Sequence, residues 1–185
     1  MYKAKVILDS QNNVGCRLTT FEVTFPRIVL AEFNTHRVFS RNAASTRAIP
    51  VVKTIQKIQH APFVPVYWGK AQSGMVADEE LTPAEIEVAQ AIWLEARDNA
   101  IKSAQALVDA KVHKQIAGRL LEPFQFVTVI VSSTEWANFF ELRCHHTAQP
   151  EIHKIAEMMQ SLYVNHTPTQ LAAGSWHIPM AEDKN

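Results

Sequence analysis

The sequence has little glycine, five residues in 185, and neither of the common Gly-rich phosphate loops. It contains no Walker pattern, and no G-x-G-x-x-G segment follows an expected strand. Such loops need glycine because their backbone N–H groups must approach the phosphates closely. The scarcity of glycine therefore excludes a P-loop or a Rossmann cradle as the means of binding a nucleotide.

Cysteine and net charge are also low. The two cysteines, Cys16 and Cys144, do not make a disulfide framework, which favours a reducing compartment. The 18 basic residues balance 18 acidic ones, whereas a nucleic-acid coat or a membrane-surface protein needs a basic excess. No apolar run approaches the length of a bilayer span, and the N-terminus lacks the apolar core of a signal peptide. We therefore expect a soluble cytoplasmic protein with no nucleic-acid or membrane partner.

The apolar pattern predicts one domain over residues 1–185, of mixed α/β (α+β) class, with a mixed sheet flanked by helices. We expect strands at 2–8, 18–25 and 124–131, the last of them buried on both faces. We expect helices at 27–34, 52–58, 83–109, 112–121, 135–144 and 150–163. The tail at 167–185 is expected to be irregular, with Trp176 packed against the domain.

Three stretches carry clear local signals. Thr82-Pro83-Ala84-Glu85 combines an N-cap threonine, a first-turn proline and a glutamate three residues after the cap, which predicts a helix start. Pro123 is expected to end the helix before it, because the residue ahead of a proline leaves the helical region. Residues 60–78 are rich in proline, glycine and aromatic residues, which predicts a long loop that serves as a lid or a subunit contact.

The segment from Phe33 to Arg47 is the most cationic part of the chain. It holds three arginines, His36 and several hydroxyl side chains, with almost no acid. We expect it to form an open loop after the apolar helix that follows Pro26. Guanidinium groups match phosphate oxygens bidentately, and hydroxyls supply further hydrogen bonds. The loop therefore predicts a phosphate or nucleotide site, with a solvated polar loop as the alternative.

Two further groups are candidates for binding. Gln115 and Arg119 are four residues apart and share a helix face, although a solvated surface is the favoured interpretation from the pattern alone. Asn138 and Arg143 lie on an apolar helix. A buried arginine there must meet an anion or a carbonyl, and a structural ion pair would satisfy it equally well.

The histidine-rich stretch near residue 145 predicts no metal site. His145 and His146 are adjacent and point in different directions on a helix, and neither HExxH nor a paired CxxC accompanies them. Cys144 has cationic neighbours that can activate a thiol, but a small packing thiol is the more frequent explanation.

Three blocks of the sequence, in order, resemble the motifs of flavin-dependent thymidylate synthases. Thr35-His36-Arg37, seven residues and then Ser45 is similar to the family's Arg-His-Arg-x7-Ser. Gly118-Arg119-Leu120-Leu121-Glu122-Pro123 resembles its Ala-Arg-x-x-Leu-Pro. Asn138 to Arg143 and Ala148 to Ile152 resemble its Asn-Phe-x-x-Leu-Arg and Ala-Gln-x-Glu-Ile. The resemblance covers about residues 18–165, and the long loop at 60–78 looks like that of phage-encoded members.

The resemblance implies a homotetramer that methylates dUMP to dTMP at sites between subunits. FAD, NADPH and 5,10-methylenetetrahydrofolate are its implied cofactors, and no cysteine nucleophile acts. The implied flavin contacts are His36, Arg37, Val38 and Asn138. The implied dUMP contacts are Ser45, Arg47, Gln115, Arg119 and Arg143, of which Ser45 and Arg143 are the expected catalytic residues. A guanidinium at the ring edge stabilises charge that grows on the pyrimidine as hydride arrives.

Three positions depart from the family pattern. Thr35 replaces an arginine, Ala43 a glutamate, and Glu32 a neutral glutamine. Losing one charge-assisted hydrogen bond, about 1.5–3 kcal/mol, would weaken binding roughly 10- to 100-fold. The family's upstream histidine-containing flavin motif is also missing. Two alternatives therefore stay open: a hydroxymethylase or other C5-modifying enzyme acting on a pyrimidine deoxynucleotide, and an inactive nucleotide- or flavin-binding relative.

Overall fold

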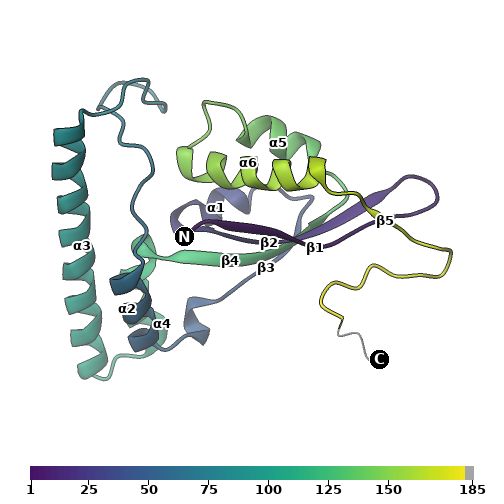
Figure 1. Ribbon diagram of the computed structural model, residues 1–185. Helices are drawn as coiled ribbons and strands as arrows, with labels where there is room; N and C mark the ends of the chain where they lie inside the picture. The colour runs from purple at the N-terminus through teal and green to yellow at the C-terminus, as the bar shows by residue number, and fades with distance from the viewer. Residues whose placement is uncertain (182–185) are drawn as a thin grey trace.

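A five-stranded mixed sheet forms the centre of the computed structural model, which describes residues 1–181 (Figure 1). The strands are β1 (Lys3–Gln11), β2 (Arg17–Pro26), β3 (Ser40–Ala43), β4 (Phe126–Ser133) and β5 (Thr169–Gln170). Their order in the sheet is β3-β4-β2-β1-β5. All neighbours pair antiparallel except β5, which runs parallel to β1. The predicted mixed α/β class is confirmed.

The helices surround this sheet unevenly. They are α1 (Leu30–Phe33), α2 (Val51–His60), α3 (Pro83–Asp109), α4 (Lys114–Ala117), α5 (Ala137–Arg143) and α6 (Pro150–Asn165), with 3₁₀ turns at Arg27–Val29, Thr46–Ala48 and Gly118–Phe124. In Figure 1, α5 and α6 lie across one face of the sheet, whereas α2, α3 and α4 gather at one end. The fold thus has a main core under α5 and α6 and a smaller helical end.

The main core is built by alternate side chains of β2 and β4. The register places opposite one another the buried pairs Phe21–Val131, Val23–Val129 and Phe25–Val127. Residues of α5 and α6 close this layer, including the fully buried Ile152 and Ile155. The expectation that the strand at 124–131, now β4, is buried on both faces is wrong. Thr128 is exposed, and the other β4 side chains that point away from the core are only partly buried.

The cationic stretch at 33–47 is not one open loop. Its middle forms β3, which pairs with β4 from Ser40 opposite Ser132 to Ala43 opposite Val129. A 3₁₀ turn at Thr46–Ala48 follows it. The prediction failed because a four-residue edge strand of polar residues is too short to display an alternating pattern. The strand pins the stretch to the sheet edge, so its arginines project from a defined backbone.

Two other segment boundaries differ from expectation. The helix expected at 112–121 is instead the single turn α4 followed by a 3₁₀ segment that continues through Pro123 to Phe124. Proline lacks the N–H that a continuing α-helix needs, and the chain adopts the tighter turn there. β4 consequently begins at Phe126, two residues later than predicted.

The C-terminal tail is partly ordered by the sheet edge. β5 interrupts the expected irregular stretch, and the Leu171 N–H extends the pairing to the Gln11 carbonyl at 2.8 Å. Trp176 does not pack as expected, because 80 % of its surface is exposed. The next residue, His177, contacts the sheet instead. Its ring nitrogens form hydrogen bonds with the hydroxyls of Ser10 and Thr20 at 2.7 and 2.8 Å. Residues 182–185 of the predicted tail lie outside the described part.

The longest helix begins where the sequence predicts it. The Thr82 hydroxyl accepts from the Glu85 N–H at 3.4 Å, and the Glu85 carboxylate accepts from the Thr82 N–H at 2.9 Å. This reciprocal capping box satisfies two N–H groups that a helix start leaves unpaired. The inner face of α3 packs through Ala104 and Trp93 on an apolar cluster from α2 and the 3₁₀ segment.

Replacing Thr82 with alanine is expected to lower the free energy of unfolding by about 1 kcal/mol, because an N-cap acceptor is lost. Urea denaturation followed by circular dichroism measures the change. Thr82→Ser, which keeps the hydroxyl, serves as the matched control and should stay within about 0.5 kcal/mol of the wild type. Equal stability of the alanine variant and the wild type would contradict a role for the cap.

Candidate functional site

Two adjoining cavities flank the short helical segment from Arg27 to Asn34. The Arg119 cavity, of about 430 Å³, is lined by Arg27, Asn34, Arg119 and Glu122 among others. The Arg143 cavity, of about 870 Å³, lies on the other side. Ile28 lines both cavities, so they adjoin at this side chain. Their volumes lie in the range usual for small-molecule sites.

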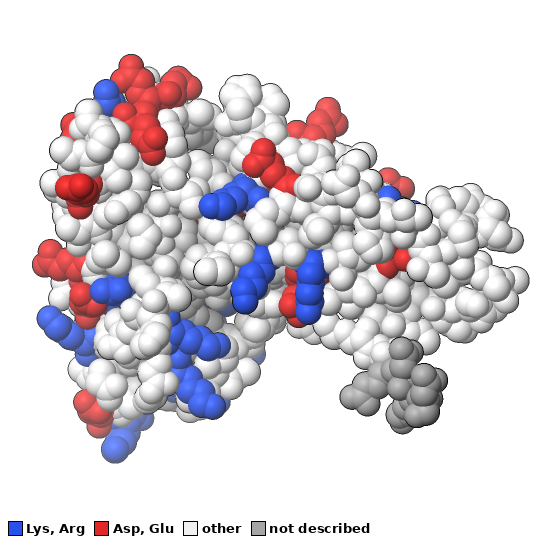
Figure 2. All heavy atoms as spheres, in the orientation of Figure 1, with Lys and Arg blue, Asp and Glu red and all other residues white. Residues whose placement is uncertain are grey.

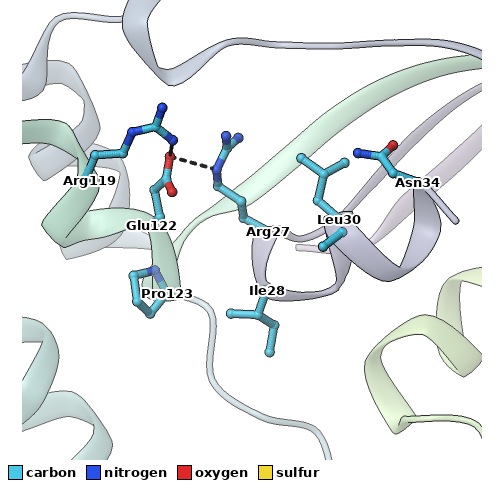
Figure 3. Close-up of a pocket in the computed structure, with 8 residues that line it drawn as sticks. Arg27, Ile28, Leu30, Asn34, Arg119, Glu122 and Pro123 are labelled. Carbon is cyan, nitrogen blue, oxygen red and sulfur yellow. Dashed lines mark hydrogen bonds and ion pairs between the residues drawn. The ribbon is translucent and has the colours of Figure 1, made fainter. Parts of the chain in front are cut away.

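The Arg119 cavity joins two sequence blocks through one carboxylate. Glu122 Oε1 pairs with Arg119 at 2.9 Å and with Arg27 at 3.2 Å (Figure 3). The same oxygen accepts a hydrogen bond from the Thr46 hydroxyl at 3.1 Å. The 3₁₀ segment Gly118–Phe124 therefore holds Arg119 beside the turn after Ser45. Two guanidinium groups share one carboxylate, which leaves an excess of positive charge in this cavity.

Ser45 and Arg47 border this arrangement. Ser45 caps the 3₁₀ turn, its hydroxyl accepting from the Arg47 N–H at 3.3 Å. Arg47 is exposed, and its guanidinium makes no hydrogen bond or ion pair with any residue in the described range 1–181. On the face in Figure 2, Lys and Arg side chains gather at the end that carries α2 and α4. An anionic group is therefore favoured on this side.

Arg143 projects from the end of α5 into the second cavity, held by two acceptors. Its Nε donates to His36 Nε2 at 3.0 Å, and its NH1 forms an ion pair with Glu32. The arginine side chain is 19 % exposed, so it remains reachable from the cavity. The sequence allowed Arg143 either an external anion or a structural ion pair. The structure shows the structural ion pair, which Glu32 supplies.

His36 is held as a neutral imidazole. Its burial, followed by the charges of Arg143 and Arg41, lowers its pKa to about 4. The ring is therefore uncharged near neutral pH, and its Nε2 lone pair can accept from Arg143. Edge contact with the Phe139 ring, at a centroid distance of 4.9 Å, fixes the imidazole against α5.

Arg41 has a structural role in this region. Its guanidinium donates to the carbonyls of Asn34, His36 and Phe39 at 2.7 to 3.1 Å, and to the Asn34 side chain at 2.7 Å. It thereby closes the turn between α1 and β3. The sequence did not separate this arginine from those of the site, because composition cannot tell a guanidinium that bonds its own backbone from one that is free.

The loop at 60–78 forms a wall of the Arg143 cavity. Tyr67 and residues 75–78 line it, together with Trp93 of α3 and the start of α6. Glu151 at that start is 4 % exposed and accepts from the Val66 N–H at 3.4 Å, which ties the loop to α6. Three carboxylates and one arginine line this cavity, so its charge is opposite to that of the Arg119 cavity.

Several predicted residues lie outside both cavities. Gln115 is exposed on α4, and its backbone N–H donates to His113 Nδ1 at 3.3 Å. Arg37, Val38 and Asn138 are also exposed, on the turn before β3 and at the start of α5. These two segments are in contact through the rings of Phe39 and Phe139, whose centroids are 5.2 Å apart. Arg27 was missed, and its position after Pro26 was the only local signal.

Two other kinds of site were considered in the sequence, a nucleophilic Cys144 and a metal site. Burial, followed by the charge of Glu157, raises the pKa of the Cys144 thiol, which disfavours the thiolate nucleophile. Among residues 1–181, no group of three His, Cys, Asp or Glu side chains is placed to hold a metal ion. Within the same range, no helix has the length and apolar character needed to cross a membrane.

The structure is thus a mixed α/β domain with two adjoining cavities, one lined by Arg27 and Arg119 and the other by Arg143. The family model described as Thymidylate synthase complementing protein matches residues 17–169. The chain belongs to this family, which confirms the resemblance seen in the three sequence blocks.

Solved structures show the same fold. One is the UMP/dUMP methylase PolB from Streptomyces cacaoi bound with 5-Br dUMP, 17 % identical, covering 89 % of this chain and 90 % of that chain with a TM-score of 0.73. The same protein bound with 5-Br UMP is 16 % identical, covers 89 % of each chain and also has a TM-score of 0.73. No curated protein sequence matches the chain.

Proposed function

We propose that the protein is an enzyme that modifies C5 of a pyrimidine deoxynucleotide, methylating dUMP to dTMP. The observation that carries this proposal is the pair of cavities around Ile28, which present Arg119 and Arg143 to neighbouring spaces. A nucleotide has a charged end and a nearly neutral ring. The membership of the chain in its family supports the choice of a thymidylate-forming reaction.

The two ends of the nucleotide suit different cavities. Arg27 and Arg119 both pair with the Glu122 carboxylate, and the Thr46 hydroxyl bonds the same carboxylate from the turn that holds Ser45 and the exposed Arg47. We therefore propose that the phosphate binds on this side, together with the Ser45 hydroxyl. The Arg143 cavity holds Glu32, Asp78 and Glu151, which repel a phosphate but tolerate a neutral base. In this arrangement the sugar, which joins the phosphate to the base, lies beside Ile28, where the two cavities adjoin.

Arg143 acts on the ring. Negative charge develops on the pyrimidine carbonyl when a hydride adds to the ring, and a fixed guanidinium stabilises that charge. His36 and Glu32 hold the guanidinium in place before the substrate arrives, which avoids a reorganisation cost during the reaction. Because the pKa of His36 is lowered to about 4, its ring is uncharged near neutral pH and adds no second positive charge beside Arg143.

Three exposed side chains beside the Arg143 cavity support the proposal of a flavin site. Arg37 and Asn138 offer exposed donors suited to a diphosphate and a ring edge, and Val38 offers an exposed apolar contact, beside the aromatic contact of Phe39 with Phe139. We propose that His36, Arg37, Val38 and Asn138 hold FAD, which supplies hydride chemistry when bound. The methylene group comes from 5,10-methylenetetrahydrofolate and two electrons from NADPH, which leaves tetrahydrofolate and a methyl group.

We further propose that the enzyme is a cytoplasmic homotetramer. Val88 and Ile92, four residues apart on α3, are each 61 % exposed and form an apolar strip on the outer face of the helix. Burying this strip between copies of the chain would remove it from water. Sedimentation equilibrium with the wild type and with Ile92→Glu measures the oligomeric state, and a monomeric wild type would overturn the tetramer.

The decisive experiment is to incubate the protein with FAD, NADPH, 5,10-methylenetetrahydrofolate and each pyrimidine monophosphate, and then to weigh the products. A gain of about 14 mass units on dUMP indicates methylation, and a gain of about 30 indicates hydroxymethylation. The protein should also take up FAD and become yellow. Failure to bind FAD, with no product from any nucleotide, would overturn the proposal.

A hydroxymethylase or other C5-modifying enzyme is the second candidate, favoured by two departures from the family pattern. Thr35, in place of an arginine, uses its hydroxyl to bond the Glu32 carbonyl at 2.7 Å. Ala43, in place of a glutamate, lies in β3 and offers no polar side chain. The same mass measurement separates this candidate from the first, and flavin binding without any turnover would instead indicate an inactive relative.

A further inference from the structure

We propose that Glu32 is a specificity-determining residue: its carboxylate accepts a ring N–H of the base while Arg143 donates to the adjacent ring carbonyl. The inference rests on the proposed function, in which the base occupies the Arg143 cavity. It assigns to that cavity the imide edge of a uracil-type ring, where an N–H lies between two carbonyl groups.

The bonding capacity of the pair supports this assignment. A guanidinium carries five N–H groups, and Arg143 uses Nε for His36 and NH1 for Glu32, which leaves further donors toward a ligand. Glu32 uses Oε1 for this ion pair, and its Oε2 bonds no residue in the described range. The side chains of Arg143 and Glu32 are 19 % and 28 % exposed, and both line the cavity. The wall therefore presents a free acceptor beside free donors.

The other two carboxylates of the cavity have hydrogen-bond partners of their own. Glu151 accepts from the Val66 N–H and from the Gln149 amide at 3.1 Å, and Asp78 accepts from the Gln72 amide at 3.2 Å. Within the described residues, Arg143 is the only Lys or Arg that lines this cavity. The Glu32–Arg143 pair is consequently the one place on this wall where an ionised acceptor adjoins a cationic donor.

The identity of residue 32 decides how strongly the site discriminates between a ring nitrogen that carries hydrogen and one that does not. An ionised carboxylate only accepts hydrogen bonds, whereas a glutamine amide can turn and offer either an acceptor or a donor. With glutamate, a ring nitrogen that carries no hydrogen would set its lone pair against a carboxylate oxygen. Leaving a desolvated polar group unpaired is costly, so such a ring is rejected.

The test compares dUMP with its N3-methyl derivative, which lacks the ring N–H, by isothermal titration calorimetry on the full chain. In the wild type, N3-methylation should weaken binding by about 10- to 100-fold. In Glu32→Ala, which accepts nothing, the same methylation should change the affinity by less than about threefold. Glu141→Ala removes an exposed carboxylate from α5 and should retain the full wild-type discrimination.

Glu32→Gln provides a second variant of nearly native shape, in case loss of the ion pair unfolds Glu32→Ala. It should show discrimination between that of the wild type and that of a non-accepting residue. An equal cost of N3-methylation in the wild type and in the folded variants would overturn the role of Glu32. If the wild type still binds and converts dUMP, that result leaves the proposed function intact, whereas a wild type that binds no pyrimidine monophosphate overturns both.

Discussion

Replacing Arg143 with alanine is expected to lower the turnover of the pyrimidine nucleotide by about 100- to 1000-fold. The reason is that a fixed donor aimed at developing charge contributes about 2.7–4 kcal/mol to the transition state. His36 and Glu32 hold the guanidinium in place before substrate binds. No other Lys or Arg among the described residues lines the cavity, so none can substitute for Arg143. The loss should appear mainly in kcat, since the charge on the ring exists only during the reaction.

The measurement is steady-state product formation by the FAD-loaded enzyme with dUMP, NADPH and 5,10-methylenetetrahydrofolate. Arg97→Ala is the matched control, because Arg97 lies on α3 and pairs with its neighbour Asp98 at 2.8 Å. A thermal melt of each variant separates lost chemistry from lost folding. Turnover of Arg143→Ala within about threefold of the wild type would remove Arg143 from the reaction.

Replacing Asp9 with alanine should destabilise the protein by about 3–5 kcal/mol, because the change leaves a largely buried arginine without its counter-charge. The Asp9 side chain is fully buried and receives two hydrogen bonds from Arg17, at 2.9 and 2.7 Å. Thr19 and His166 each add another at 2.9 Å. Arg17 in turn donates to the Tyr163 carbonyl, so the cluster ties the β1–β2 hairpin to the end of α6.

Urea denaturation at neutral pH measures this loss. Glu22→Ala is the matched control from the same hairpin, since Glu22 pairs with Lys5 at 3.2 Å but both side chains are substantially exposed. An exposed ion pair contributes about 0–1 kcal/mol, so the control should change little. Equal effects of the two substitutions would show that burial of the Asp9 pair does not matter to stability.

Asp9 also predicts an acid dependence of stability. Burial alone would raise the pKa of its carboxyl group, but hydrogen bonds from Arg17, Thr19 and His166 and the charge of Arg17 outweigh burial, and the net pKa is lowered. Because the folded pKa lies below the unfolded value, this contribution is complete above the ordinary aspartate pKa, about 4, and is lost as pH falls through the folded pKa. Asp9→Asn should show a flatter loss of stability below about pH 4 in a pH series of urea melts.

Elements with strong local signals were predictable. The capping box at Thr82 and the apolar repeat after it define α3 within the chain itself, and the structure places its ends at Pro83 and Asp109 as expected. The alternating residues of β2 likewise specify a strand with one buried face. β3 was missed because its four residues become a strand only by pairing with β4, which follows more than eighty residues later.

The candidate site was also predictable only in part from the sequence. The sequence marked the cationic stretch, Arg119 and Arg143 as candidates by their chemistry, and it identified the family by the order of three short blocks. It could not tell that Arg41 bonds backbone carbonyls while Arg47 has no partner among the described residues, since the two have the same side chain. It also did not reveal Arg27 as the second cation on Glu122.

By itself, then, the sequence determined which residue types are available and which helices and long strands they form, because those properties depend on neighbours along the chain. Only the tertiary structure decided which charges meet. Glu32 and Arg143 are 111 residues apart, and their ion pair exists because β4 and α5 return the chain to the end of α1. Electrostatic pairing acts over a few ångströms of space, and that distance is set by the packed fold.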